Sequence, residues 1–398
     1  MMSQMESLKN STNITLLYTS TPKYIDVATY TRLQELKSSY ANIHGYLSTA
    51  VCLVGILANI ANIVVLNKKH MRTSTNIILL WLAVADLCAM VEYVTFAIPF
   101  YVFKEEGMPS IFHNRTYGWM FYLLFHANFS LSMHSISIWL TIMLATFRFI
   151  YIFLFTRANK YCSIRHAKIV ILIIYIGAVV LCIPNYISNY WVRVNITNTV
   201  SGENETVYTF EERNYGPYLY IFDMNYWIQS ILIKLVPCVL LTILTIMLIL
   251  GLRKAYKNHQ QIQSQGLRNN DVEKHHEHYR TTSMLLAVVI LFLIVELPHG
   301  IMTLLMIFMG ELHSELYDPL GDILDIVALM NSGVNFVLYC SMSKQFRDTF
   351  IATFCKCFTS NEDREKWINM SLITQRNRAS SRKMSNITHA NGSLGQMV

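Results

Sequence analysis

Residues 143–153 read MLATFRFIYIF and place one permanent charge, Arg148, at the end of a long apolar segment. Mostly apolar residues precede it over a length of about 20, which is what a helix needs to cross a bilayer core about 30 Å thick. Phe147 and Phe149 flank the arginine. The charge is either a side chain that reaches out to lipid phosphates or a group with a function, because ionisable residues inside a membrane are costly.

The composition of the whole chain is that of a membrane protein. Of its 398 residues, 53% are hydrophobic and 14% are charged, whereas about a quarter of the residues of a soluble domain are charged. Seven segments are apolar enough to span a bilayer, at residues 43–66, 74–101, 119–147, 167–190, 226–252, 282–309 and 319–341. The sequence therefore predicts an all-α membrane protein, a seven-transmembrane helix bundle over residues 43–342.

The distribution of lysine and arginine over the loops predicts the orientation of the bundle. Basic residues concentrate in one set of loops, at 68–72, 157–165 and 253–280, and after residue 343, whereas the opposite loops are acidic. We therefore expect an extracellular N-terminus and a cytoplasmic C-terminus. The net charge of +7 comes mostly from this asymmetry, so it does not indicate a nucleic-acid-binding protein.

The segments outside the bundle are polar. Residues 1–42 have no apolar core and no small-residue cleavage site, so we expect an extracellular N-terminal tail and no signal peptide. Residues 359–398 are charged and rich in serine and threonine, which is typical of a disordered cytoplasmic tail. Glycosylation sequons on the predicted outer side begin at Asn10, Asn13, Asn114, Asn195 and Asn204.

Residues 343–358 predict a short amphipathic eighth helix on the membrane surface. Apolar side chains share one face and basic residues lie opposite, the apolar ones being Phe346, Phe350, Ile351 and Phe354. Cys355 and Cys357 follow directly, and juxtamembrane cysteines are candidates for palmitoylation. The alternative is that both are unmodified thiols.

Polar residues also gather inside the predicted spans. In the third segment a row of side chains shares one helix face, namely Ser130, His134, Ser137, Thr141 and Arg148. Further polar residues lie in the first, second and seventh segments, at Asn59, Asp86, Asn331, Ser332 and Asn335. With Ser137 they either surround a small cation such as Na⁺ or form a neutral hydrogen-bond network around a protonated Asp86.

This pattern resembles the rhodopsin-like (class A) G-protein-coupled receptors over residues 43–354. Asn59 matches the first-helix asparagine, LAVAD at residues 82–86 matches the second-helix signature, and Arg148 stands at the arginine of the D-R-Y motif. The sequence NFVLY at residues 335–339 stands where N-P-x-x-Y is expected. The fifth- and sixth-helix prolines of such receptors correspond to Pro237 and Pro298.

The resemblance implies a role for the charge at the end of the third helix. In such receptors this arginine holds the resting state closed and contacts the G protein when the helices part. We expect Arg148, Tyr339 and Asn335 to form the coupling and activation group, together with Glu296 and Lys234 on the sixth and fifth helices. Glu296 is either neutral or paired with Lys234 as a structural or switching lock.

Four departures from the class pattern narrow the resemblance. Phe147 replaces the acidic neighbour of the arginine, Phe336 replaces the seventh-helix proline, and Glu296 stands where a tryptophan is usual. Leu123 occupies the third-helix cysteine position, and the second outer loop contains no cysteine, so the extracellular disulfide of the class is absent. Together, TSTNIILLWLAVADL, WIQSILIKLVPCVLLT, ELPHGI and NSGVNFVLYC resemble invertebrate, nematode-type receptors for myosuppressin, FMRFamide-like and sex-peptide ligands.

That branch implies an amidated neuropeptide as ligand, outside the plasma membrane, and a heterotrimeric G protein of the Gi/o type inside. Phosphorylated serines of the tail would recruit an arrestin. A peptide ending in Arg-Phe-amide needs a carboxylate for its guanidinium, an aromatic pocket and groups that recognise the neutral amide. The candidate ligand-binding residues are Asp325, Asp322, Glu92, His299, Glu311, Asp223, Phe129 and Tyr226. Asp322 is alternatively a solvated side chain near the outer mouth.

Other functions fit the sequence less well. An opsin needs a lysine in the seventh helix, and residues 319–341 contain none. A transporter would show paired repeats, and an enzyme would need clustered nucleophiles or metal ligands. The histidines of the polar 258–278 segment lack helical support, so we expect no metal site. The main alternative is a chemosensory G-protein-coupled receptor for a small molecule.

Overall fold

The computed structural model describes residues 22–103, 116–154, 158, 160–197, 204–213, 215–263, 286, 289–291, 293–305, 308–309 and 313–354. The long helices are α2 (Val27–Leu66), α3 (Ser74–Ala97), α4 (Tyr117–Phe153), α6 (Ile164–Ser188), α8 (Val236–Gln263) and α10 (Asp318–Met342). Shorter elements are the helices α7 (Leu219–Trp227) and α11 (Lys344–Phe354) and the strands β1 (Asn189–Thr197) and β2 (Asn204–Glu212). The 3-10 turns are η1 (Lys69–Met71) and η3 (Gly216–Tyr218), and the π-helical turns are η2 (Ile98–Val102), η4 (Ile228–Leu235) and η5 (His313–Tyr317).

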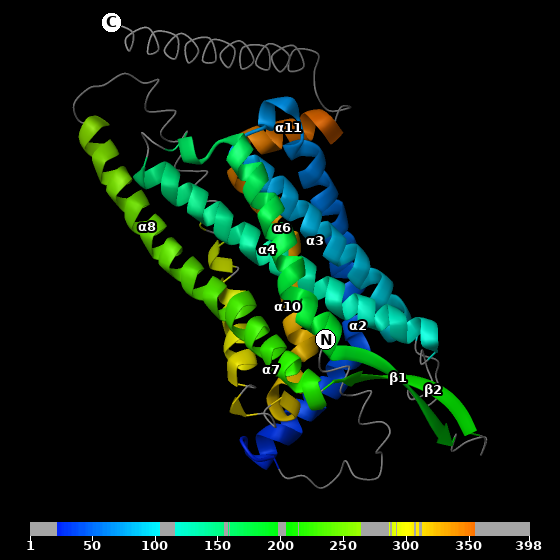
Figure 1. Ribbon diagram of the computed structural model, residues 1–398. Coiled ribbons are helices and arrows are strands. Elements are labelled where there is room, and N and C mark those ends of the chain that lie inside the picture. Colours follow the sequence, from blue (N-terminus) through cyan, green and yellow to red (C-terminus); the bar gives the residue numbers. More distant parts are fainter. Residues whose placement is uncertain are drawn as a thin grey trace, which may run out of the picture.

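The helices form one bundle of membrane-spanning length (Figure 1). Within the described residues, six helical stretches are long and apolar enough to cross a membrane, and a shorter apolar helix, Val289–Leu305, takes the place of the sixth predicted span. The β1–β2 hairpin lies at one end of the bundle and α11 crosses the other (Figure 1); we call these the hairpin end and the α11 end. The predicted seven-helix fold is confirmed.

The first helix is longer than its apolar segment. α2 begins at Val27 and not at residue 43, because Asp26 caps it: the carboxylate of Asp26 accepts a hydrogen bond from the Thr29 backbone N–H at 2.9 Å. The hydrogen bonds from Thr29 also lower the pKa of the Asp26 carboxyl. Part of the predicted N-terminal tail is therefore helical. Capping sets this end of the helix, and hydropathy alone does not detect it.

The chain before α2 is tied to η5, about 290 residues later in the sequence. The buried carboxylate of Glu315, in η5, accepts hydrogen bonds from the backbone N–H groups of Lys23, Tyr24 and Ile25, at 2.6, 3.0 and 3.3 Å. Three donors satisfy a charge that would otherwise be costly to bury. The contact joins residues 23–25 to η5, directly before α10, at the hairpin end.

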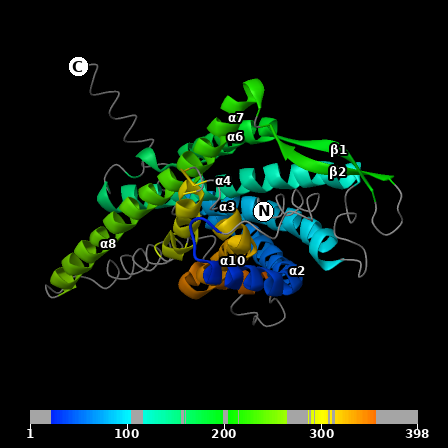
Figure 2. The same ribbon diagram turned by 90° about the horizontal axis from the view of Figure 1, so that it is seen from below.

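The second predicted outer loop is a hairpin, which the all-α prediction did not include. β1 and β2 pair antiparallel, from Asn189 opposite Glu212 to Thr197 opposite Asn204. The strands lie beside the first turns of α4, as both views of the molecule show (Figures 1 and 2).

Aromatic contacts hold the hairpin against α4. The rings of Trp191 and Tyr208 lie 4.9 and 5.8 Å from that of Tyr117 at the start of α4, and 5.7 Å from each other. Phe210 belongs to the same buried cluster as Leu123, the position where the class carries its cysteine. The six cysteines that the structure describes are all free. Apolar and aromatic packing therefore anchors this hairpin without a described disulfide.

At the α11 end, contacts between aromatic side chains hold α11 against α10 of the bundle. Phe346 of α11 is buried and packs on Tyr339 and Phe336 of α10, at ring distances of 5.5 and 6.1 Å. Phe336 also contacts Phe350 at 5.3 Å. The residue that replaces the usual proline of α10 therefore supplies an anchor for the following helix.

Candidate ligand-binding cavity

A cavity of about 190 Å³ lies between the helices toward the hairpin end. Residues of α3, α4, α6, α7, η4, η5, α10 and the Val289–Leu305 helix line it, together with residues of β1 and β2. Its ionisable lining residues are Asp86, His134, Glu212, Lys234, His299 and Asp325. Aromatic side chains line it as well, at Tyr93, Phe210, Tyr226 and Tyr317. An apolar pocket with a few convergent polar groups is the usual form of a binding site.

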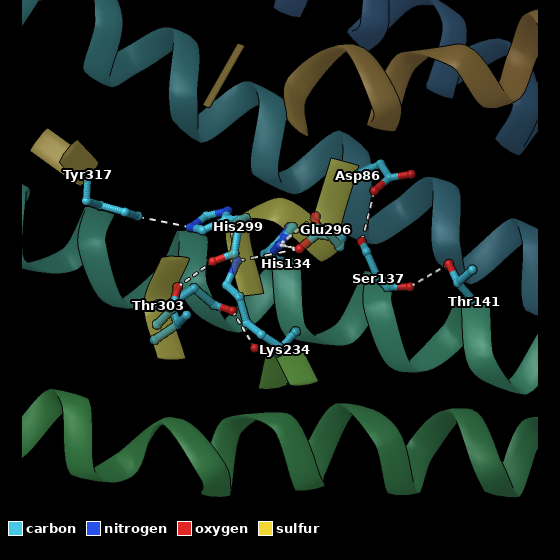
Figure 3. Close-up of polar contacts among 11 residues, drawn as sticks. Asp86, His134, Ser137, Thr141, Lys234, Glu296, His299, Thr303 and Tyr317 are labelled. Atoms are coloured by element: carbon cyan, nitrogen blue, oxygen red, sulfur yellow. Dashed lines mark hydrogen bonds and ion pairs between the residues drawn. The ribbon is translucent and has the colours of Figure 1, made fainter. Parts of the chain in front are cut away.

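Charged and polar side chains from four elements form a chain across this cavity (Figure 3). The Glu296 carboxylate is 1% exposed and lies 3.2 Å from Nε2 of His134 and 3.5 Å from Nζ of Lys234. Lys234 is 7% exposed and also lies 3.0 Å from Nδ1 of His299. The other ring nitrogen of His299 meets the Tyr317 hydroxyl at 3.0 Å.

This chain connects elements that are far apart in the sequence. Of the two alternatives for Glu296, the structure shows the pairing with Lys234. The neighbouring packing is close, because a Cβ added at Gly300 would lie 3.4 Å from Cβ of Lys234. A buried carboxylate and a buried ammonium stabilise one another, and removing either leaves the other uncompensated. The cluster therefore couples α4, η4 and the sixth span.

The floor of the cavity holds the predicted network around Asp86. The Ser137 hydroxyl donates to Oδ1 of Asp86 at 2.9 Å, and Nδ2 of Asn335 donates to Oδ2 at 3.4 Å. A small hollow of about 20 Å³ adjoins these groups, and Asn331 and Ser332 also line it. Asn59 lies to one side, donating to the carbonyls of Gly55 and Ser332 at 3.0 and 3.3 Å.

The predicted ligand residues are distributed over several places. Asp325, His299 and Tyr226 line the cavity, and the Tyr226 hydroxyl donates to Oε1 of Glu212 at 3.5 Å. Asp322 is 6% exposed and accepts a hydrogen bond from the Tyr101 hydroxyl at 3.0 Å. It is therefore buried and paired, not solvated.

The other candidates do not line the cavity. Glu92 is buried beside the buried His126, whose Nδ1 lies 2.5 Å from its carboxylate. Asp223 is exposed, and Phe129 stacks on Phe125 of its own helix with ring centres 5.1 Å apart. Five predicted sites lie outside the described residues, at Asn10, Asn13, Asn114, Cys355 and Cys357, as does Glu311. Of the described sequons, Asn195 is exposed on β1 and Asn204 begins β2.

The sequence reasoning missed several lining residues. Asn185 is a polar side chain inside an apolar segment, so the rule applied to Asp86 would have found it. Gln229 belongs to the quoted WIQSIL stretch and carried the same signal. Glu212 and Phe210 gave no comparable signal, because their place at the cavity depends on the hairpin.

Arg148 lies toward the α11 end of α4. Its neighbour Phe147 is buried in the largest apolar cluster together with Tyr339. Nε of Arg148 has no hydrogen-bond partner among the residues that the structure describes. The acidic neighbour of the class pattern is thus replaced by Phe147, a side chain that packs in the core.

Comparison with known proteins identifies the family. The family model described as serpentine type 7TM GPCR chemoreceptor Srw matches residues 46–357. The chain belongs to this family of G-protein-coupled receptors. As a receptor of this kind it is a multi-pass membrane protein that acts with heterotrimeric G proteins, and it is not an enzyme.

Its relatives include receptors named for neuropeptides. G-protein coupled receptor dmsr-1 of Caenorhabditis elegans is 32% identical over 356 residues, which cover 79% of this receptor and 68% of that protein. The sex peptide receptor of Drosophila melanogaster is 26% identical over 330 residues, 81% of this receptor and 74% of that one. The FMRFamide receptor of the same fly is 23% identical over 320 residues, 78% and 54% of the two chains. The predicted resemblance to invertebrate neuropeptide receptors is confirmed.

Proposed function

We propose that this receptor binds a neuropeptide with an amidated Arg-Phe C-terminus and activates a G protein of the Gi/o type. The observation that carries the proposal is the lining of the cavity, which combines the carboxylates of Asp325 and Glu212 with the rings of Tyr93, Phe210 and Tyr226. A carboxylate suits a guanidinium and the rings suit a phenylalanine. Relatives named sex peptide receptor and FMRFamide receptor support a peptide ligand.

The charge distribution supports the orientation that this function requires. Basic residues lie in the loops at the α11 end, and the hairpin end carries the acidic loops, so the hairpin end would face outward from the plasma membrane. Sequons at Asn195 and Asn204 lie on this hairpin and would accept glycans there. On the inner side, we propose that Cys355 and Cys357 carry palmitate and that phosphorylated serines of the tail recruit an arrestin.

The ligand would act through its different affinities for two arrangements of the helices. The Glu296–Lys234 contact joins the fifth and sixth spans, and Lys234 lines the same cavity. A peptide that engages Asp325 or His299 would alter this contact and so change the relative positions of the two spans. Arg148, at the other end of the bundle, would then contact the G protein.

A chemosensory function for a small molecule is the second candidate. The matching family model carries the description chemoreceptor, and the cavity of about 190 Å³ is smaller than the roughly 300–1,000 Å³ of typical ligand pockets. A compact ligand would fit without any rearrangement, whereas a peptide would have to extend past the hairpin.

The test is suppression of cAMP in cells that express the receptor, challenged with amidated Arg-Phe peptides and with their free acids. We expect the amides to suppress cAMP, and we expect Arg148→Ala to abolish that signal while labelled peptide still binds. Pertussis toxin should also abolish it if the coupling is Gi/o. Silence to every amidated peptide at confirmed surface expression, with a response to small odorant-like molecules, would favour the chemosensory function instead.

We also propose that the polar floor of the cavity, around Asp86, binds a sodium ion in this receptor. Asp86, Ser137 and Asn335 meet at the small hollow, and hard cations prefer such oxygen ligands. Replacing choline by Na⁺ at constant ionic strength should lower agonist affinity about fivefold or more. Asp86→Asn should remove this dependence. Equal ion sensitivity in the variant would contradict the assignment.

A further inference from the structure

Five side-chain amides meet at one wall of the cavity. Asn128 comes from α4, Asn185 from α6, Asn189 from the start of β1, Asn225 from α7 and Gln229 from η4. Asn128, Asn185 and Asn225 are buried, whereas Asn185, Asn189 and Gln229 line the cavity. A neutral polar cluster at membrane depth must satisfy its own hydrogen bonds or serve a ligand.

The orientation of these amides follows from one backbone group. Nδ2 of Asn128 donates to the carbonyl of Leu124 at 2.8 Å, and a carbonyl can only accept. Oδ1 of Asn128 therefore faces the neighbouring amide, and Nδ2 of Asn185 donates to it at 2.7 Å. This contact turns Oδ1 of Asn185 toward the other three amides, where it accepts from Asn189, Asn225 and Gln229 at 3.0 Å each.

The network uses the side-chain nitrogens of Asn189 and Gln229 as donors and leaves the side-chain oxygens of both residues available. Nδ2 of Asn189 also donates to the backbone carbonyl of Asn185 at 2.9 Å, and Nε2 of Gln229 donates to Oδ1 of Asn225 at 3.0 Å. No described residue donates to Oε1 of Gln229 or to Oδ1 of Asn189. Because neither amide can turn without breaking these contacts, both present a carbonyl oxygen, which can only accept.

We propose that Gln229 and Asn189 form the subsite that recognises the C-terminal carboxamide of the peptide. This inference rests on the proposed function. It identifies the two residues that would make the receptor prefer a peptide with an amidated C-terminus over the same peptide with a free carboxylate. A carboxamide carries two N–H donors for these two acceptors. A free carboxylate carries no donor, and its negative oxygens would face fixed carbonyl oxygens. Asp325, in the lining of the same cavity, would then hold the guanidinium.

The test compares the potencies of one Arg-Phe-amide peptide and its free acid, measured as cAMP suppression. The wild type should prefer the amide by about tenfold or more, because the acid leaves both acceptors unpaired. Gln229→Met should remove most of this preference by weakening the amide while sparing the acid. Gln345→Met, the same change at an exposed position of α11, is the matched control and should leave the ratio unchanged.

A second variant separates recognition from folding. A lysine at position 229 keeps donors for Asn185 and Asn225 but replaces the acceptor by a cation, so Gln229→Lys should favour the free acid over the amide. A misfolded receptor cannot gain a preference for a new ligand. Labelled amide binding and surface expression are measured in parallel for every variant.

The outcomes keep the two proposals apart. If the amide activates the wild type but Gln229→Met lowers amide and acid equally and Gln229→Lys does not reverse the order, the cluster only packs the helices. The amide subsite is then overturned and the peptide receptor stands. If the wild type responds to neither peptide, both proposals fail. A changed ratio in Gln229→Met together with a reversed order in Gln229→Lys supports the subsite.

Discussion

Replacing Glu296 by glutamine is expected to destabilise the folded receptor by about 3–5 kcal/mol, which is the usual cost of leaving a buried charge uncompensated. The Lys234 ammonium lies 3.5 Å from the carboxylate and is 7% exposed. Glutamine has nearly the shape of glutamate, so the packing is preserved and only the charge is lost. Thermal unfolding of the purified receptor in detergent measures the loss.

The companion variants make this prediction specific. Lys234→Met should also destabilise the receptor, because it leaves the Glu296 carboxylate with His134 alone at 3.2 Å. The double variant Glu296→Gln with Lys234→Met should recover most of the stability, since neutral replacements of a buried ion pair are often tolerated. Glu35→Gln, at an exposed position of α2, is the control. Additive losses in the double variant would show that the two charges do not stabilise each other.

Much of the bundle could be predicted from the sequence, because a bilayer imposes a length and a hydropathy on each span. Helical periodicity placed Ser137 on an inward face of α4, and the structure brings its hydroxyl to Asp86. The pairing of Glu296 with Lys234 was one of two alternatives, and it is the one observed. These features depend on local spacing or on the cost of charge in a membrane.

Features that depend on tertiary structure could not be predicted in the same way. Residues 27–42 of α2 are largely polar, so hydropathy does not detect this part of the helix, whereas the Asp26 cap starts it. The partners of Glu92 and Asp322, which are His126 and Tyr101, depend on how neighbouring helices are rotated. The pattern of a single span does not show which residue faces such a carboxylate, and for Asp322 it left a solvated side chain open, whereas the structure buries it.

Replacing Asp325 by asparagine is expected to lower the potency of an Arg-Phe-amide peptide by about 30-fold or more, because losing one partner of a desolvated charge pair costs about 2–5 kcal/mol. Asp325 lines the cavity, and asparagine preserves its shape while removing its charge. Asp322→Asn is the matched control. Its carboxylate lies one helical turn away but is buried against Tyr101, so a much smaller change is expected.

A peptide carrying citrulline in place of arginine tests the pairing itself. Citrulline is neutral and close to arginine in shape, so it should weaken binding to the wild type by a similar factor. Against Asp325→Asn it should cause little further loss, because the charge that the arginine would meet is already gone. If the citrulline penalty persists in full, Asp325 is not the partner of the guanidinium. Glu212, which also lines the cavity, would then take that role, and Glu212→Gln should abolish the penalty instead.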